Sequence, residues 1–131
     1  MIGSIQNQHA QMLCTLARDD ESTLQYPLPD QIYGFHAQQS CEKLMKALLT
    51  AHGVAYPFTH ILAVLIKELT VHNELLPVTS FDLKRLEPYA VQLRYDTSNR
   101  LSPDERTAIR DAVVLLREHI VTRILALESI P

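Results

Sequence analysis

Hydrophobic side chains recur every three or four positions along most of this chain. That spacing predicts amphipathic α-helices, because an α-helix completes one turn in about 3.6 residues. Five helical segments are expected, starting near residues 5, 30, 59, 80 and 102. The connections between them are short, which favours an up-down antiparallel bundle of four to five helices. The sequence therefore predicts an all-α fold.

The segment 30–53 shows how one such helix is specified. Asp30 suits a helix N-terminus and Gly53 suits a C-terminus. Its core-facing stripe is expected to consist of Tyr33, Ala37, Cys41, Leu44, Leu48 and Ala51. Polar side chains fill the opposite side, with Phe35 in their middle. Because a phenylalanine on a polar flank needs cover, this position predicts contact with another helix or with a second chain.

The remaining segments carry start and stop signals of different clarity. The run 102–105, Ser-Pro-Asp-Glu, has the form of a capping box with proline at the first helical position. Thr59 is the expected cap of a third helix that is apolar over a broad arc and is expected to lie deep in the bundle. Ser80 is the expected cap of a fourth helix, which Pro88 either starts or kinks. The charged run 18–21 is expected to be solvated.

Composition narrows the class of protein. A chain of 131 residues with 47% hydrophobic positions suits a single domain spanning residues 1–131. The net charge of −3 is unlike the basic character of proteins that bind duplex nucleic acid. No window approaches the roughly 20 apolar residues of a membrane span, and no secretory signal is evident, so a cytoplasmic location and no membrane contact are expected.

The cysteines and histidines do not predict a metal or cofactor. Cys14 and Cys41 lie in apolar helical contexts without metal-ligand spacing, so buried reduced thiols are expected. The six histidines form no HExxH or similar pair. We therefore expect no metal site and no cofactor.

A row of polar side chains is the first candidate site. His36, Gln39, Lys43 and Lys46 recur at steps of three and four, which places them along one helix flank. We call these four residues the polar row. Lysine charge, glutamine hydrogen bonds and histidine together suit phosphate oxygens and the edge of a base. Two other interpretations stand beside this one, namely surface ion pairs such as Glu42 with Lys46, and a seam between two chains.

Two longer motifs narrow the interpretation further. Residues 35–49, FHAQQSCEKLMKALL, resemble a helix with the pattern FHAQQAxEKxLKALL. Residues 86–96, LEPYAVQLRYD, resemble the pattern L-x-PYAVxxRYP, with Asp96 in place of the usual proline. Residues 59–62 are similar to a THDL helix start, with Ile61 where aspartate is usual. In this order and at this distance, the motifs resemble those of HEPN-domain proteins, the higher eukaryotes and prokaryotes nucleotide-binding family.

The resemblance implies a HEPN-like helical bundle that forms homodimers in bacteria or archaea. Many small family members are encoded beside a minimal nucleotidyltransferase and form a toxin–antitoxin-like pair with it. Other members are metal-independent ribonucleases with an arginine followed, after four to six residues, by a histidine. No arginine of this chain has a histidine at that distance, and Arg117 and His119 are too close together. The resemblance therefore favours the partner-binding or nucleotide-binding branch over an enzyme.

These arguments select three groups of candidate residues. The polar row is expected to contact a nucleotide, RNA or a protein partner. A second cluster, in which a tyrosine and an arginine could stack a base and hold a phosphate, has the same expectation; it consists of His60, Tyr89, Arg94 and Tyr95. The expected dimer interface consists of Phe35, Gln38 and Glu42.

Three other interpretations fit the same residues. A metal-independent ribonuclease could use His36 or His60 in place of the missing histidine. A purely structural helical dimer would use the polar side chains only to join helices. In the second cluster the tyrosine rings could simply pack, with Arg94 paired to Glu87 or Asp96.

Overall fold

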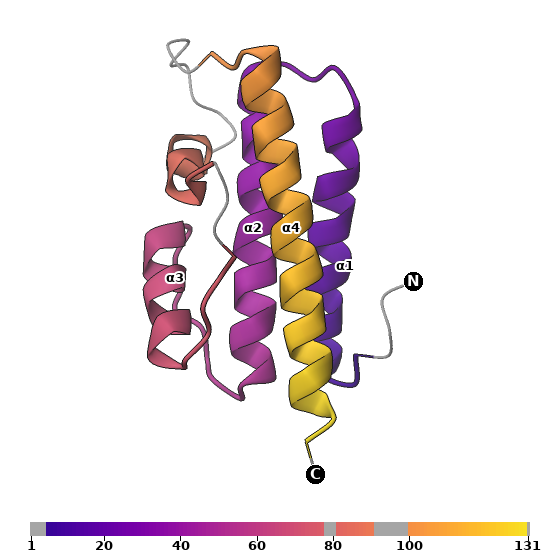
Figure 1. The fold of residues 1–131 in the computed structure, drawn as a ribbon, viewed down its shortest axis with the longest axis vertical. Helices are drawn as coiled ribbons and strands as arrows, with labels where there is room; N and C mark the ends of the chain where they lie inside the picture. The colour runs from indigo at the N-terminus through magenta and orange to yellow at the C-terminus, as the bar shows by residue number, and fades with distance from the viewer. Residues whose placement is uncertain (1–4, 78–80, 91–99, 131) are drawn as a thin grey trace.

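The computed structural model describes residues 5–77, 81–90 and 100–130. Within these ranges the chain forms helices and no strands. The α-helices are α1 (Gln8–Ser22), α2 (Asp30–Ala51), α3 (Leu62–Val71) and α4 (Pro103–Glu128), and the 3-10 helices are η1 (Thr23–Gln25) and η2 (Leu83–Tyr89). The predicted all-α helical bundle is confirmed (Figure 1).

The three long helices lie side by side and are joined at both ends. α1 is antiparallel to α4, because the backbone N–H of Gln6, just before α1, donates to Glu128 at the end of α4 over 2.9 Å. α2 and α4 begin at the same end, where the Leu101 N–H donates to Asp30 over 3.2 Å. Between these two helices in the sequence come α3 and η2, which lie on the side of α2 away from α1 (Figure 1).

Local capping decides where the helices start. The Asn7 side chain accepts hydrogen bonds from the N–H groups of His9 and Ala10, so α1 begins at Gln8 and not near residue 5 as expected. Ser102 and Glu105 form the predicted capping box at α4. These side chains satisfy backbone donors that the first helical turn leaves without partners.

The start of the third helix was predicted wrongly. α3 begins at Leu62, and its N-cap residue Ile61 makes no side-chain cap hydrogen bond. Thr59 instead accepts a hydrogen bond from the Ile61 N–H within the loop before the helix. The hydroxyl therefore stabilises a turn two residues upstream of the helix.

The fourth predicted helix appears in the described residues as the short 3-10 helix η2. Asp82 caps it by accepting from the Lys84 N–H, and Pro88 lies inside it. Pro88 therefore neither starts nor kinks an α-helix, because the described segment is a 3-10 helix that ends at Tyr89. The predicted cap Ser80 and the predicted continuation through Leu93 lie outside the described residues.

The core follows the predicted stripe of α2. Tyr33, Ala37, Cys41, Leu44 and Leu48 are all buried, and Ala51 packs against the core from a partly buried position. Buried residues from the other helices complete this single cluster, including Leu13, Leu65, Leu86, Val113 and Ile120. No helix within the described ranges is long and apolar enough to cross a membrane.

α3 lies at the edge of the bundle and not deep within it. Its residues Leu62, Leu65 and Leu69 are fully buried, whereas Val64 and Val71 are exposed. The expectation of a deep helix was therefore wrong for the outer half. The broad apolar arc exceeds what contact with α2 and η2 covers.

The two cysteines are free and buried, as predicted. Burial raises the pKa of the Cys14 thiol to about 11 and that of Cys41 to about 12. Both therefore remain protonated and unreactive in the native protein, because the thiolate is the reactive form.

Candidate functional site

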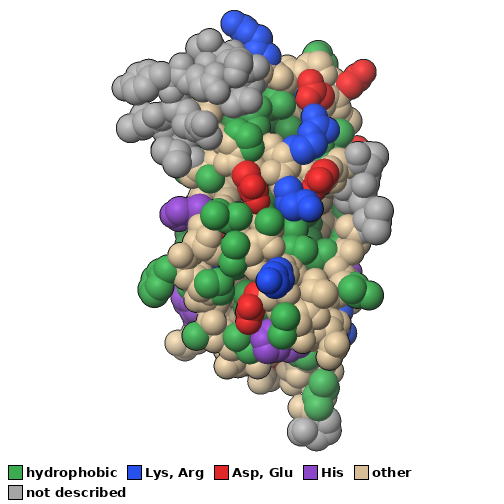
Figure 2. Space-filling view, turned by 90° about the vertical axis from the view of Figure 1, so that its left-hand side faces the viewer, with side chains coloured by type: hydrophobic (Ala, Val, Ile, Leu, Met, Phe, Trp, Pro, Cys, Tyr) green, Lys and Arg blue, Asp and Glu red, His purple; other side chains and the backbone are tan. Residues whose placement is uncertain are grey.

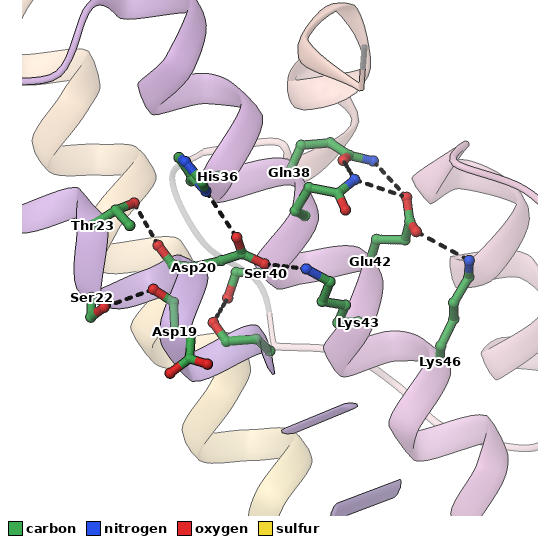
Figure 3. Close-up of polar contacts among 12 residues, drawn as sticks. Asp19, Asp20, Ser22, Thr23, His36, Gln38, Ser40, Glu42, Lys43 and Lys46 are labelled. Atoms are coloured by element: carbon green, nitrogen blue, oxygen red, sulfur yellow. Dashed lines mark hydrogen bonds and ion pairs between the residues drawn. The ribbon is translucent and has the colours of Figure 1, made fainter. Parts of the chain in front are cut away.

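Asp20 accepts hydrogen bonds from two members of the polar row. This carboxylate comes from α1, is 9% exposed, and accepts from His36 Nδ1 over 2.8 Å and from Lys43 Nζ over 2.5 Å. The two donors lie two turns apart on α2, on either side of the carboxylate (Figure 3). These two contacts tie α1 to α2.

The burial of Asp20 corrects the prediction that the charged run 18–21 is solvated. Arg18 and Asp19 are exposed, but Asp20 is buried and Glu21 pairs with Arg117 of α4 over 2.7 Å. The sequence held a signal for this: Asp20 follows Leu13 and Ala17 at steps of four and three, so it shares their core-facing side.

Glu42 is the second carboxylate that accepts several hydrogen bonds. Its carboxylate accepts from Lys46 Nζ over 3.1 Å, from His60 Nδ1 over 3.0 Å, and from the amides of Gln38 and Gln39 over 3.3 and 3.5 Å. Glu42 is only 5% exposed. This cluster fixes the loop before α3 to α2, because His60 belongs to that loop.

Gln38 completes this cluster from a fully buried position. Its amide nitrogen donates to the His60 carbonyl over 2.8 Å, and its oxygen accepts from the Gln39 amide over 2.8 Å. A buried amide needs such partners, since leaving it unpaired costs about 1–3 kcal/mol. The three glutamine and glutamate side chains therefore support one another (Figure 3).

The charges of this region balance within one chain. Lys43 and Lys46 are neutralised by Asp20 and Glu42. A phosphate that approached these lysines would compete with two carboxylates that are already in contact with them. The region can therefore bind polar groups by hydrogen bonding, but it offers little excess positive charge to an anion.

The two histidines share one geometry. His36 and His60 each turn Nδ1 toward a carboxylate, Asp20 and Glu42 respectively. Because a carboxylate accepts, Nδ1 carries a hydrogen, and in a neutral ring this leaves Nε2 as the acceptor. This is the arrangement in which a carboxylate orients a histidine, and the ring of His60 is 68% exposed.

The residues predicted for the dimer interface lie in different environments. Gln38 and Glu42 are buried within one chain, as described above. Phe35 is half-buried, and its ring meets the ring of His36 edge-on with 5.4 Å between centroids. Their contact with a second chain stays a prediction.

The second predicted cluster is only partly described. Tyr89 is buried and its ring lies against Gly34 of α2, while His60 lies beside Glu42, two turns further along the same helix. Arg94 and Tyr95 lie outside the described residues. The use of this cluster in binding stays a prediction.

A third polar cluster was missed by sequence reasoning. Glu74 is 3% exposed and accepts from His52 Nε2 over 2.8 Å and from Arg123 Nε over 2.9 Å. Burial alone would raise the pKa of Glu74, but the hydrogen bonds from Arg123 and His52 outweigh it and lower the pKa. The three residues are distant in sequence, so no local spacing could have indicated the contact.

Near the other end of the bundle, Arg106 joins α4 to the start of α2. Its guanidinium donates to Asp30 over 2.7 Å and to the Leu28 carbonyl, and it lies over the Tyr33 ring at 4.5 Å. The hydrogen bond from Arg106 holds the pKa of Asp30 below its usual value. A surface cleft of about 480 Å³ opens beside Arg106, and its lining also includes Tyr26, Tyr33, Arg110 and Asp111.

No group of three or more acidic, histidine or cysteine side chains that could hold a metal ion occurs within residues 5–77, 81–90 and 100–130. In a comparison with known families, the family model described as HEPN domain matches residues 29–121. No curated protein and no solved structure matches the chain. The matched range contains the polar row, Glu42 and Tyr89, but not Asp20.

Proposed function

The chain belongs to the HEPN-domain family, and from that premise we propose that it is a homodimeric binding module that partners a minimal nucleotidyltransferase. The family comprises nucleotide-binding and ribonuclease-like modules. One observation carries the proposal: the family match extends over residues 29–121, yet no arginine in the sequence is followed by a histidine after four to six residues. The proposal includes a toxin–antitoxin-like role for the pair in a prokaryotic cell.

The charge balance of the polar row supports a protein partner over a nucleotide as its main ligand. Each lysine of the row already contacts a carboxylate of the same chain. A nucleotide phosphate would have to replace Asp20 or Glu42, whereas a protein surface can add hydrogen bonds to the exposed edge of His60 without breaking those pairs. Nucleotide binding at the row is therefore the weaker part of the proposal.

Co-purification tests the partner. The tagged protein would be co-expressed with the product of the adjacent gene, which we expect to be a minimal nucleotidyltransferase, and the eluate would be analysed by size-exclusion chromatography with light scattering. We expect one complex of fixed stoichiometry. The control is a nucleotidyltransferase encoded elsewhere in the same genome, which should not co-elute. Separate elution of the neighbouring protein would contradict the proposed partnership.

A metal-independent ribonuclease is the second candidate function. The orientation of His36 and His60 by carboxylates favours it, because such a pairing fixes the ring so that Nε2 can act as a general base toward a ribose 2′-hydroxyl. The test is the integrity of RNA incubated with the purified protein in EDTA. We expect intact RNA.

Cleavage of RNA would support the ribonuclease only if it depends on His36 and His60. The double variant His36→Ala/His60→Ala would then lose it, while His9→Ala, a change at an exposed histidine of α1, would keep it. RNA that is cut by the wild type and spared by the double variant would overturn the binding-module proposal.

A further inference from the structure

Exposed hydrophobic side chains concentrate around α3. Among the described residues, five of the ten large hydrophobic side chains that are exposed fall between residues 58 and 75, and they are Phe58, Ile61, Val64, Val71 and Leu75. Val71 is 65% exposed. Figure 2 faces this side of the molecule and shows hydrophobic side chains spread around basic and acidic ones in its lower half. A helix that is apolar on both sides is normally covered on both sides.

The outer face of α3 has a simple geometry. Val64 and Val71 are seven residues apart, so they lie two turns apart on the face opposite the buried Leu62 and Leu69. At about 100° per residue, Lys67 falls about 60° to one side of Val64 and Glu68 about 40° to the other. We call Val64, Lys67, Glu68 and Val71 the α3 face. It is an apolar line with a cation along one edge and an anion along the other.

Both charges remain accessible to another molecule. Lys67 is exposed and forms no ion pair with the described residues, and the Glu68 side chain is 39% exposed and forms an ion pair with His72 over 3.6 Å. Each side of the apolar line therefore offers one charge of a defined sign.

We infer that the α3 face binds the α3 face of a second copy of this chain, with the two helices parallel. A two-fold axis along the helices places Val64 opposite Val64 and Val71 opposite Val71. It also places Lys67 of each copy opposite Glu68 of the other, on both edges of the contact. This inference rests on the proposed homodimer and assigns its interface to the α3 face in place of the Phe35, Gln38 and Glu42 surface expected from the sequence.

The positions of Lys67 and Glu68 favour a second copy of the chain as the partner, and they favour a parallel over an antiparallel pair of α3 helices. An antiparallel pair would bring Lys67 against Lys67 and Glu68 against Glu68, because a two-fold axis across the helices keeps each edge on its own side. Like charges in such contact cost several kcal/mol across an interface. Only the parallel pair makes this face complementary to itself.

The size of the face sets the strength of the dimer. α3 has ten residues and is therefore about 15 Å long. A standard stable interface uses about 20–30 residues on each side, which is more than the 58–75 region supplies. The dimer is accordingly concentration-dependent, and single changes on the face shift its dissociation constant measurably.

A charge swap tests the inference. The dissociation constant of the full chain would be measured by sedimentation equilibrium for the wild type, Lys67→Glu, and Lys67→Glu/Glu68→Lys. We expect Lys67→Glu to weaken the dimer by roughly ten-fold or more, which corresponds to about 1.4 kcal/mol. The double variant should recover at least most of the wild-type affinity, because it restores opposite charges on both edges. Met12→Glu, at an exposed hydrophobic position of α1, is the matched control and should leave the constant unchanged.

The outcomes distinguish failure of the homodimer from failure of the α3 face as its interface. A wild type that stays monomeric at every concentration would overturn the homodimer itself. A wild-type dimer that Lys67→Glu does not weaken would leave the homodimer standing and overturn the α3 face as its interface. Loss in both the single and the double variant would also overturn the parallel charge pairing, provided that circular dichroism shows both variants folded.

Disulfide trapping tests the direction of the helices. In the parallel pair, Val64→Cys alone and Val71→Cys alone each form a covalent dimer on mild oxidation. In an antiparallel pair, neither does so alone, and only a mixture of the two variants crosslinks. The native thiols Cys14 and Cys41 do not interfere, because both are buried. Met12→Cys is the exposed control and should remain monomeric on the denaturing gel, whereas crosslinking only in the mixture would contradict the parallel arrangement.

Discussion

Two buried carboxylates decide what the polar row can do. Asp20 of α1 accepts from two side chains of α2, and Glu42 of α2 accepts from Lys46 of the same helix and from His60 in the loop before α3. A carboxylate that is removed from water is stabilised only when cations and donors surround it, and the same donors become costly when the carboxylate is lost. The row is therefore coupled to the stability of the bundle whatever ligand it binds.

Replacing Glu42 with glutamine should lower the free energy of unfolding by about 3 kcal/mol, because breaking a buried ion pair leaves the remaining charge without its partner. That charge is Lys46, whose side chain is only 12% exposed. The midpoint of urea unfolding would measure the change. The matched control is Glu118→Gln on the exposed side of α4, which should stay within about 0.5 kcal/mol of the wild type. Equal effects of the two variants would show that the Glu42 cluster contributes little.

At the same scale, the sequence could predict which residues form the row and one of their contacts, the ion pair of Glu42 with Lys46, but not the others. Steps of three and four place His36, Gln39, Lys43 and Lys46 on one flank, and the structure keeps them on α2. His36 and Lys43 instead bind Asp20, which lies on another helix, α1. Periodicity describes one helix at a time, so the pairing of a lysine with a carboxylate on another helix is beyond it.

Among the elements, strong local signals were predictive and weak ones were not. The capping box at Ser102 and the stripe of α2 are both confirmed, because each depends on residues within one or two turns. The segment between α2 and α4, which contains α3 and η2, was less predictable. α3 starts three residues after its expected cap Thr59, and η2 is a 3-10 helix that contains Pro88. Contacts with α2 hold these short segments, and those contacts are set by tertiary packing.

η2 approaches α2 at a position that only glycine can occupy. A Cβ atom added at Gly34 would lie 2.3 Å from the Tyr89 ring, well inside the contact distance of two carbon atoms. Gly34 lies within α2, where alanine would otherwise favour the helix by about 1 kcal/mol. The close contact therefore outweighs helix propensity at this position.

Gly34→Ala should therefore destabilise the protein by about 1–3 kcal/mol, the usual cost of overpacking. Thermal unfolding followed by circular dichroism would measure it. In a double-mutant cycle, Gly34→Ala should cost much less in the background of Tyr89→Ala, because the ring that it meets is gone. A Gly34→Ala variant as stable as the wild type would show that η2 can move away from α2 without loss.

For the molecule as a whole, two ion-pair clusters fasten α2 to α4 near opposite ends. Near the start of both helices, Arg106 joins Asp30, and near the other end of the bundle Arg123 joins Glu74, which also contacts His52, the C-cap residue of α2. Both carboxylates have lowered pKa values, because their hydrogen-bonded cations favour the ionised form. The helical ends are thus held together by groups that titrate in acid.

This arrangement predicts how stability depends on pH. A carboxylate whose pKa is lower in the folded than in the unfolded protein stabilises the fold fully above its ordinary pKa, which is 3.8 for Asp30 and 4.5 for Glu74. That contribution is lost as the pH falls through the lowered folded values, because the unfolded chain then binds more protons. The free energy of unfolding should therefore decrease from about pH 4.5 downward.

Urea unfolding across this range would measure the slope, and the variants Asp30→Asn and Glu74→Gln should each be less stable near neutral pH and show a shallower acid slope. Control measurements with Asp104→Asn, at an exposed position of α4, should reproduce the wild-type slope. A wild-type slope that persists in both variants would assign the acid sensitivity to other carboxylates and would remove the two clusters as the fasteners of α2 to α4.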